Sequence, residues 1–358
     1  MPDFDYLIVG RGIAGTSLAW HMHLRGLRFL IVDNPGAPSS SHVAAGIFNP
    51  LTGRKLVKTW LADRLFPYAA GFYGQVQEIL GIGCLHFTDM FRPYRNPQEK
   101  DNYLRWAAEN GYEDYISGHQ PDFTGNRFIH APFNGLSITR SGWLDLPHFL
   151  DNSRNYFRDA GCFMEADFSS EDLVLDDQHV TWQNMRFKKV INCTGIGAEK
   201  DAFFNWLPFN PVKGQILDCR VEDYDVDEIV NQGIFILPLG DGLVRIGATY
   251  SWHDLDWEVS EDARRYLSEK AAGLLKTPFS ITAQRAGIRP SSADRRPFVG
   301  RHPEYGQLYI FNGLGTKGVT LAPFFAQQLV NLLTDGQELD PEVNIERYFS
   351  LYSKPGFS

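Results

Sequence analysis

Apolar and polar runs near the N-terminus predict a strand, a helix and a second strand. Residues 6–9 are an apolar run typical of a buried strand, residues 16–25 fit a helix, and residues 29–32 predict another buried strand. Gly26 stands between the helix and the second strand, where a glycine commonly ends a helix. The pattern therefore predicts a β-α-β unit at the start of the chain.

Later segments repeat the arrangement of a short apolar strand followed by glycine. Residues 189–192 and 308–311 predict two such strands, and the second leads into a glycine-rich loop at 313–318 and a helix at 319–333. Between them, residues 234–239 and 243–249 flank Gly240-Asp241-Gly242, which is typical of a β-hairpin. Helices are also predicted at 146–160 and 258–275, and a loop at 35–41. These elements indicate two interleaved domains, one of which is mainly antiparallel sheet.

Three glycines after the first strand form a dinucleotide-binding fingerprint. Gly10 suits the tight turn, Gly12 lets the backbone approach a pyrophosphate, and Gly15 lets the helix pack closely on the strand. Asp33 ends the second strand, where an acidic side chain accepts hydrogen bonds from a ribose and repels the 2′-phosphate of NADP. The unit predicts a dinucleotide and leaves NAD and FAD both open.

Composition narrows the class of protein further. The chain has 358 residues and a net charge of −9, which argues against sequence-independent binding of nucleic acid. The four cysteines, Cys84, Cys162, Cys193 and Cys219, lie far apart and predict reduced, buried thiols without a bound metal. No apolar run approaches 18 residues, so we expect a cytoplasmic protein without a membrane span.

Six further stretches, taken in order, resemble the D-amino-acid oxidase family of FAD-dependent oxidoreductases, near its glycine oxidase and sarcosine oxidase branch. The resemblance covers nearly the whole chain. The stretches are SSSHVAAG (39–46), VINCTGIGA (190–198), PVKGQIL (211–217), FILPLGDGLVRIGATY (235–250), AGIRPSSADRRPFVGRHP (286–303) and NGLGTKGVTLAP (312–323).

Pattern and resemblance together predict the α/β (α+β) fold class. A Rossmann-like FAD-binding domain would comprise residues 1–75, 140–215 and 285–358. An antiparallel-sheet substrate domain, residues 76–139 and 216–284, would be interleaved with it.

The resemblance implies an extended FAD that is bound without a covalent link. The ADP half would lie on Gly10, Gly12, Ile13, Ala14, Gly15, Asp33 and Asn34, and the pyrophosphate and flavin edge on Ser40, Ser41, Ala45 and Gly46. Phe168 would offer backbone contacts to the adenine, and Cys193, Thr194 and Gly195 would pass the ribose and phosphates. The flavin would lie near Arg289, Gly313, Gly315, Thr316, Lys317 and Gly318. Covalent attachment is not expected, because no cysteine lies near the last glycine loop and His42 is one residue out of register.

The resemblance assigns the substrate carboxylate to Arg289, since a guanidinium binds a carboxylate with two hydrogen bonds. The alternative is a structural arginine paired with Asp294 or a helix end. Phe235 stands where the glycine oxidase branch has a tyrosine that helps to hold the carboxylate, so one donor is missing. Tyr250 would either replace that hydroxyl or fill an aromatic wall.

Two further positions carry positive charge near the expected flavin. Lys317 would help oxygen to accept an electron, or it would face solvent. The basic stretch NPLTGRKLVKTW (49–60) departs from glycine oxidase, so Arg54 or Lys58 would face the substrate, or the stretch is a solvated loop.

The resemblance implies oxidation of the C–N bond of a small amino acid or N-alkyl amino acid. Hydride would pass to flavin N5, and the imine product would hydrolyse. The electron acceptor would be oxygen, a quinone or a carrier protein. One alternative is an oxidoreductase that modifies the wobble uridine of tRNA; the acidic charge and the lack of a fused methyltransferase argue against it. Another is a non-catalytic flavin electron carrier, which would not need Arg289.

Overall fold

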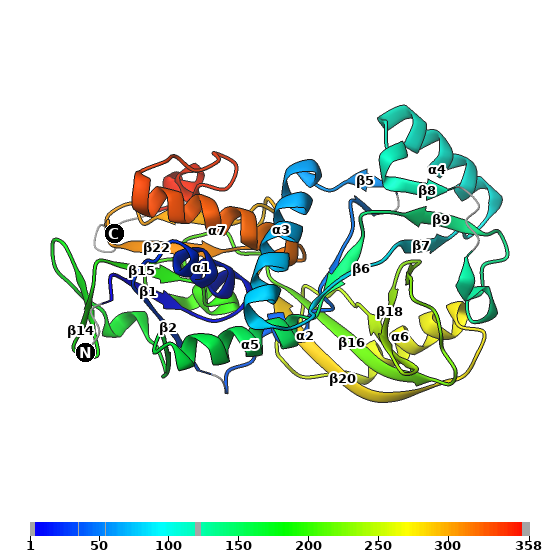
Figure 1. The fold of residues 1–358 in the computed structure, drawn as a ribbon, viewed down its shortest axis with the longest axis horizontal. Helices are drawn as coiled ribbons and strands as arrows, with labels where there is room; N and C mark the ends of the chain where they lie inside the picture. Colours follow the sequence, from blue (N-terminus) through cyan, green and yellow to red (C-terminus); the bar gives the residue numbers. More distant parts are fainter. Residues whose placement is uncertain (1–3, 35, 54, 119–122, 353–358) are drawn as a thin grey trace.

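The computed structural model describes residues 4–34, 36–53, 55–118 and 123–352. Two lobes lie side by side, one around a six-stranded sheet and the other around an eight-stranded sheet (Figure 1). Segments from the start, middle and end of the chain share the six-stranded sheet, so the interleaving expected from the sequence is present. The prediction of a mixed α/β fold is confirmed.

The six-stranded sheet is parallel except at one edge. Its strand order is β11-β2-β1-β15-β22-β21, and only β21 runs antiparallel to its neighbour. The strands are β1 (Tyr6–Val9), β2 (Phe29–Asp33), β11 (Phe163–Glu165), β15 (Lys189–Asn192), β21 (Phe298–Arg301) and β22 (Leu308–Asn312). Most residues of these strands are apolar and buried, because both faces of the sheet are covered.

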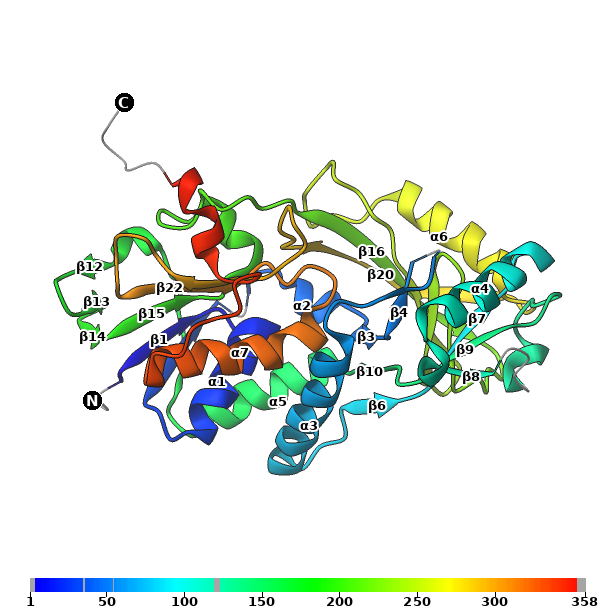
Figure 2. The ribbon, with the colours of Figure 1, turned by 90° about the horizontal axis from the view of Figure 1, so that it is seen from above.

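Four helices cover one face of this sheet, as Figure 2 shows. They are α1 (Ile13–Leu24), α3 (Ala62–Leu80), α5 (Leu146–Asp159) and α7 (Gly318–Asp335). The other face packs against a small sheet and short 3-10 helices: β12 (Val174–Leu175), β13 (Val180–Trp182), β14 (Met185–Phe187), η3 (Ser170–Asp172), η4 (Gly195–Lys200) and η5 (Ile345–Leu351).

The eight-stranded sheet is antiparallel apart from the parallel pair β17 and β7. Its order is β20-β16-β19-β18-β17-β7-β9-β8. The strands are β7 (Met90–Pro93), β8 (Ile116–Gly118), β9 (Gly135–Ile138), β16 (Val212–Val221), β17 (Ile229–Asn231), β18 (Phe235–Gly240), β19 (Leu243–Gly247) and β20 (Phe279–Arg289). α6 (Glu261–Leu274) packs on one face, and α4 (Pro97–Asn110), η1 (Glu113–Tyr115) and η2 (Thr124–Arg127) belong to the same lobe.

Short elements connect the lobes. They are α2 (Ser40–Val43), the three-stranded sheet of β3 (Ile47–Phe48), β10 (Gly142–Leu144) and β6 (Leu85–Phe87), and the pair β4 (Leu51–Thr52) and β5 (Val57–Lys58). Helix α3 spans residue 75, where the sequence placed a domain boundary. The boundaries themselves stay a prediction.

The structure corrects several details of the sequence analysis. The expected loop at 35–41 is wrong at its end, since α2 begins at Ser40. α1 begins at Ile13 and not at residue 16, because Gly12 serves as its N-cap without any side-chain signal. α6 begins at Glu261, because the Ser260 hydroxyl caps it by accepting the N–H of Ala263. The four cysteines are free thiols, but Cys162 is only half-buried.

Candidate functional site

The N-terminal ends of α1 and α7 meet. A Cβ added to Gly318, the first residue of α7, would lie 3.0 Å from Cγ2 of Ile13. In the described part of the chain, no acceptor faces the N–H groups of Gly12 and Ala14 at α1, or of Gly318 and Val319 at α7. Free N–H groups at a helix N-terminus attract anions. Two anion-attracting helix ends are therefore brought together.

The fingerprint glycines let β1, its loop and α1 pack without side chains between them. Gly10 has a φ of +100°, and a Cβ there would lie 2.6 Å from the carbonyl oxygen of Cys193. A Cβ at Gly15 would lie 1.9 Å from the carbonyl oxygen of Gly10. The Cβ direction of Gly12 meets only the Ser41 hydroxyl, at 3.2 Å, so this backbone stays open to a ligand. The loop with Gly10, Gly12 and Gly15, called the cradle below, fits the pyrophosphate of FAD.

Ser40 and Ser41 of α2 bond to the segments on either side of them. The Ser41 hydroxyl accepts the N–H of Ile13 at 3.1 Å, and the Ser40 hydroxyl donates to the carbonyl of Ile288 in β20. Ala45 is half-buried, and a Cβ at Gly46 would lie 1.9 Å from the carbonyl oxygen of Leu144. These residues join the nucleotide loop to the second lobe.

The loop after β15 packs against the fingerprint at Gly10. The Thr194 hydroxyl donates to Asn192 Oδ1 at 2.8 Å, and the carbonyl of Gly195 accepts from Asn312 Nδ2 at 2.8 Å. Cys193 is buried, and burial raises the pKa of its thiol, so it stays protonated and unreactive.

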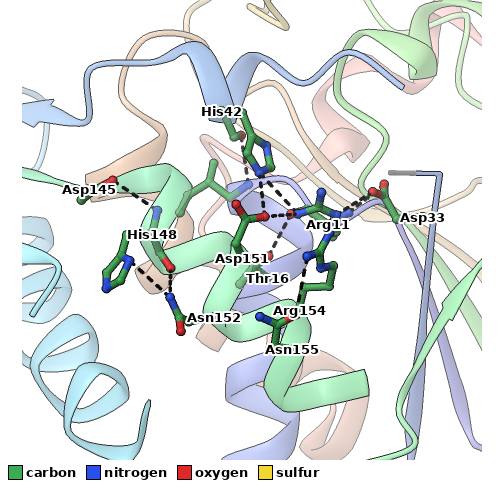
Figure 3. Close-up of polar contacts among 12 residues, drawn as sticks. Arg11, Thr16, Asp33, His42, Asp145, His148, Asp151, Asn152, Arg154 and Asn155 are labelled. Carbon is green, nitrogen blue, oxygen red and sulfur yellow. Dashed lines mark hydrogen bonds and ion pairs between the residues drawn. The ribbon is translucent and has the colours of Figure 1, made fainter. Parts of the chain in front are cut away.

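Asp33 at the end of β2 is paired with Arg11 of the fingerprint loop (Figure 3). The Arg11 N–H donates to Asp33 Oδ1 at 3.2 Å, and Arg11 Nε lies 3.0 Å from Oδ2. Burial raises the pKa of Asp33, and the N–H and the positive charge of Arg11 counteract part of that rise. Arg11 was not among the site residues predicted from the sequence, since the fingerprint leaves its position variable.

Asn34 and Phe168 lie just beyond Asp33. Asn34 Nδ2 donates to Asp167 Oδ1 at 2.5 Å, which joins the end of β2 to the segment after β11. The half-buried Phe168 ring packs against Trp182, with 5.7 Å between the ring centroids. The backbone of residue 168 is thus beside the acid expected to bind the ribose.

The loop from β22 to α7 approaches the end of β20. Gly313 and Gly315 have φ values of +71° and +53°, and the Gly315 N–H donates to the Pro290 carbonyl at 3.3 Å. Thr316 is exposed. The last glycine loop therefore borders the segment that carries Arg289.

Lys317 is mostly buried, beside Ile47, Phe48 and Phe66. Among the described residues, its ammonium has no hydrogen-bond or ion-pair partner. Burial in this apolar setting lowers the pKa of Lys317 to about 8. An unpaired cation therefore stands at the N-terminus of α7, where the free N–H groups already attract an anion.

One face of the eight-stranded sheet carries both Arg289 and Phe235. Arg289 pairs with Val212, Phe235 pairs with Gly247, and Gly247 also pairs with Ile216. Directly opposed residues share a face, and so do alternate residues of β16. Gly214 and Gly247 lack side chains on this face, and the Arg289 guanidinium and the Phe235 ring fill the positions that a Cβ would take, at 2.4 Å and 2.7 Å. Glycine inside an apolar strand was the signal for this close approach, and it was not used in the prediction from the sequence.

The Arg289 guanidinium is largely buried without a carboxylate partner in the part of the chain that the structure describes. Its Nη1 donates to the Thr249 carbonyl at 3.4 Å, and its Cζ lies 4.4 Å from the centroid of the half-exposed Tyr250 ring. Burial lowers the pKa of Arg289, and Tyr250 opposes that shift. The alternative partner, Asp294, is 3.0 Å from Arg347 instead.

The basic stretch 49–60 is described in part. Arg54 lies outside the described residues. Lys58 Nζ is 2.5 Å from Asp63 Oδ2, which matches the alternative of a solvated loop.

Features elsewhere in the described ranges do not add to this site. A cavity of about 430 Å³ beside His21, Tyr68 and Phe72 is lined by none of the predicted site residues. No helix there is long and apolar enough to cross a bilayer. The same residues include no group of three or more His, Cys, Asp and Glu side chains placed to bind a metal ion.

The chain is similar to several known proteins. The family model described as FAD dependent oxidoreductase, DAO, matches residues 5–332. The tRNA 5-methylaminomethyl-2-thiouridine biosynthesis bifunctional protein of Marinobacter nauticus is 24% identical over 359 residues, covering 91% of this chain and 54% of that protein. The glycine oxidase of Pseudomonas putida is 31% identical over 139 residues, 38% of each chain. The crystal structure of iminodiacetate oxidase from Chelativorans sp. BNC1 superposes with a TM-score of 0.75 at 21% identity, covering 96% of this chain and 98% of that chain.

The chain belongs to the DAO family of FAD-dependent oxidoreductases. FAD is its cofactor, and the expected family is confirmed. The chain spans about half the length of the tRNA-biosynthesis proteins that it matches.

Proposed function

We propose that the protein oxidises the C–N bond of a small amino acid or N-alkyl amino acid, and that Arg289 binds the substrate carboxylate. The buried, carboxylate-free guanidinium of Arg289 over a glycine-lined sheet face carries this proposal. A buried cation without an anionic partner is costly, and an anionic ligand would reduce that cost. A pure electron carrier would have no use for such a site.

The other site residues have distinct tasks. The cradle around Gly12 would hold the pyrophosphate, Asp33 the ribose, and the N-terminus of α7 with Lys317 the flavin end of FAD. When bound, FAD supplies the two-electron acceptor for the reaction. Phe235 and Tyr250 would wall the substrate next to Arg289, Tyr250 through its ring or its hydroxyl. Such a reaction depends on orientation more than on an acid–base side chain.

The experiment is anaerobic reduction of the purified holoprotein with glycine, sarcosine, proline and D-amino acids, followed by absorbance. One of these compounds should bleach the flavin band. Arg289→Ala should raise KM for that compound about a hundred-fold, since it removes a buried bidentate contact, while FAD stays bound. Arg289→Lys is the matched control and should recover part of the loss. Equal KM in all three proteins would contradict the role of Arg289, and subsequent exposure to air tests oxygen as the acceptor.

A second candidate is oxidation of a carboxymethylamine carried by a tRNA uridine. The match to a tRNA-biosynthesis protein over 91% of the chain favours it, whereas the net charge of −9 does not. The same clamp at Arg289 would serve, because such a group is an N-alkyl glycine. Bleaching by modified tRNA and by none of the small amines would select this function.

A further inference from the structure

Arg11 lies at the junction of four elements that surround the expected adenosine half of FAD. Its guanidinium contacts Asp33 at the end of β2, and its Nη1 is 3.3 Å from Asp151 Oδ1 in α5. His42 of α2 approaches the same Asp151 oxygen at 3.3 Å (Figure 3). Only 10% of the Arg11 side chain and 23% of the Asp33 side chain are exposed, so the pair is partly shielded from solvent.

The backbone of Arg11 is fixed as well. Its N–H donates to Asp33 Oδ1, and its carbonyl accepts the Thr16 hydroxyl at 3.0 Å. The side chain therefore leaves the fingerprint loop in a set direction, toward Asp33. Both the backbone and the side chain of Arg11 are therefore held by contacts with neighbouring residues.

We propose that Arg11 is a positioning residue for FAD, which keeps the half-buried Asp33 ionised and oriented so that it accepts hydrogen bonds from the ribose. A carboxylate offers both of its oxygens as acceptors to the two ribose hydroxyls, whereas protonation turns one of those oxygens into a donor. Burial favours the protonated form, and Arg11 supplies the nearest opposing charge. The inference rests on the proposed placement of the ribose at Asp33.

Other charged groups also face Asp33. Arg154 of α5 lies beside Arg11 in Figure 3, and Asp151 and His42 contact the Arg11 guanidinium. From the opposite side, Glu165 of β11 is paired in register with Asp33, and Asp167 is bonded to Asn34. Burial raises the pKa of Asp33, and the charge of Arg11, followed by that of His42, opposes this rise.

The test is the pH dependence of the dissociation constant of FAD, measured by fluorescence titration of the full chain after removal of FAD. In Arg11→Met, we expect the Kd to rise about ten-fold between pH 8.5 and pH 6, one decade for each pKa unit by which Asp33 titrates in this window. The wild type should change about three-fold or less over the same range. Arg11→Lys should restore a flat profile, because it retains the positive charge.

Three further variants separate the possible causes. Arg25→Met removes an exposed arginine beyond the other end of α1, paired with Asp335 at 3.2 Å, and should leave the Kd at its wild-type value. His42→Gln should keep the wild-type profile; a profile like that of Arg11→Met would assign the effect to the imidazole and overturn the proposal. Asp33→Asn should weaken FAD binding at every pH. Unchanged binding in Asp33→Asn would overturn the ribose placement and this inference together, whereas a pH-independent loss in Arg11→Met would overturn only the role of Arg11.

Discussion

The Arg289 guanidinium lies across Gly214 of the neighbouring strand, so that a Cβ at Gly214 would be 2.4 Å from Arg289 Cζ. Gly214→Ala should therefore displace the guanidinium while the backbone stays in place, because the obstructed atoms are the end of a flexible side chain. We expect KM for the carboxylate substrate to rise about ten-fold to a hundred-fold. Steady-state kinetics measures this rise.

The matched control for this variant is Gly273→Ala in α6, where a Cβ meets nothing within 4 Å. It should leave KM unchanged. If Gly214→Ala also leaves KM unchanged, Arg289 does not bind the carboxylate from this position.

Lys317 should destabilise the FAD-free chain at neutral pH. Its pKa falls from 10.5 to about 8 on folding, so the unfolded chain binds more protons between these values and stability rises with pH there. Lys317→Met should therefore be more stable than wild type by about 1–3 kcal/mol at pH 7, and this gain should vanish as the pH rises from 8 to 10.5. Urea unfolding of both proteins at pH 7 and pH 10 measures the difference. A variant less stable at pH 7 would show that the ammonium has a stabilising partner.

The close approach of Gly15 to Gly10 makes position 15 intolerant of any side chain. Gly15→Ala places a Cβ 1.9 Å from a backbone oxygen, so β1 and α1 must separate, at a cost of roughly 3 kcal/mol or more. Gly71→Ala in α3 meets nothing within 4 Å and should stabilise the chain by about 0.5–1 kcal/mol. Thermal unfolding ranks the two variants, and equal Tm values would contradict the packing.

Lys213 of β16 depends on Asp256 for its ion pair. The Lys213 side chain is 6% exposed and contacts the Asp256 carboxylate, which lowers the pKa of Asp256. Asp256→Asn leaves a buried ammonium without its anion and should lower Tm. Asp262→Asn, which breaks an exposed pair with Arg265, is the control and should leave Tm nearly unchanged. Equal shifts in the two variants would show that the Lys213 pair contributes no more than a surface pair.

The structure of residues 6–33 was largely predictable from the sequence, because each element there is specified by local patterns. β1, β2 and the fingerprint glycines occur as expected, as do β15 and the hairpin of β18 and β19. Helix α3 was not predicted, since Pro67, Gly71 and Gly74 interrupt its pattern and tertiary packing on α7 supports it instead.

The sequence by itself determined the nucleotide fingerprint, the mixed α/β class and the family, because these depend on residue order and short spacings. Only the tertiary structure decided which distant residues meet: Ile13 with Gly318, Arg11 with Asp33 and Asp151, and Arg289 with Gly214. Strand register and helix packing set these contacts, and neither is written in local periodicity. Lys317 is buried for the same reason, because segments far apart in the chain pack around it and exclude water. This burial lowers its pKa.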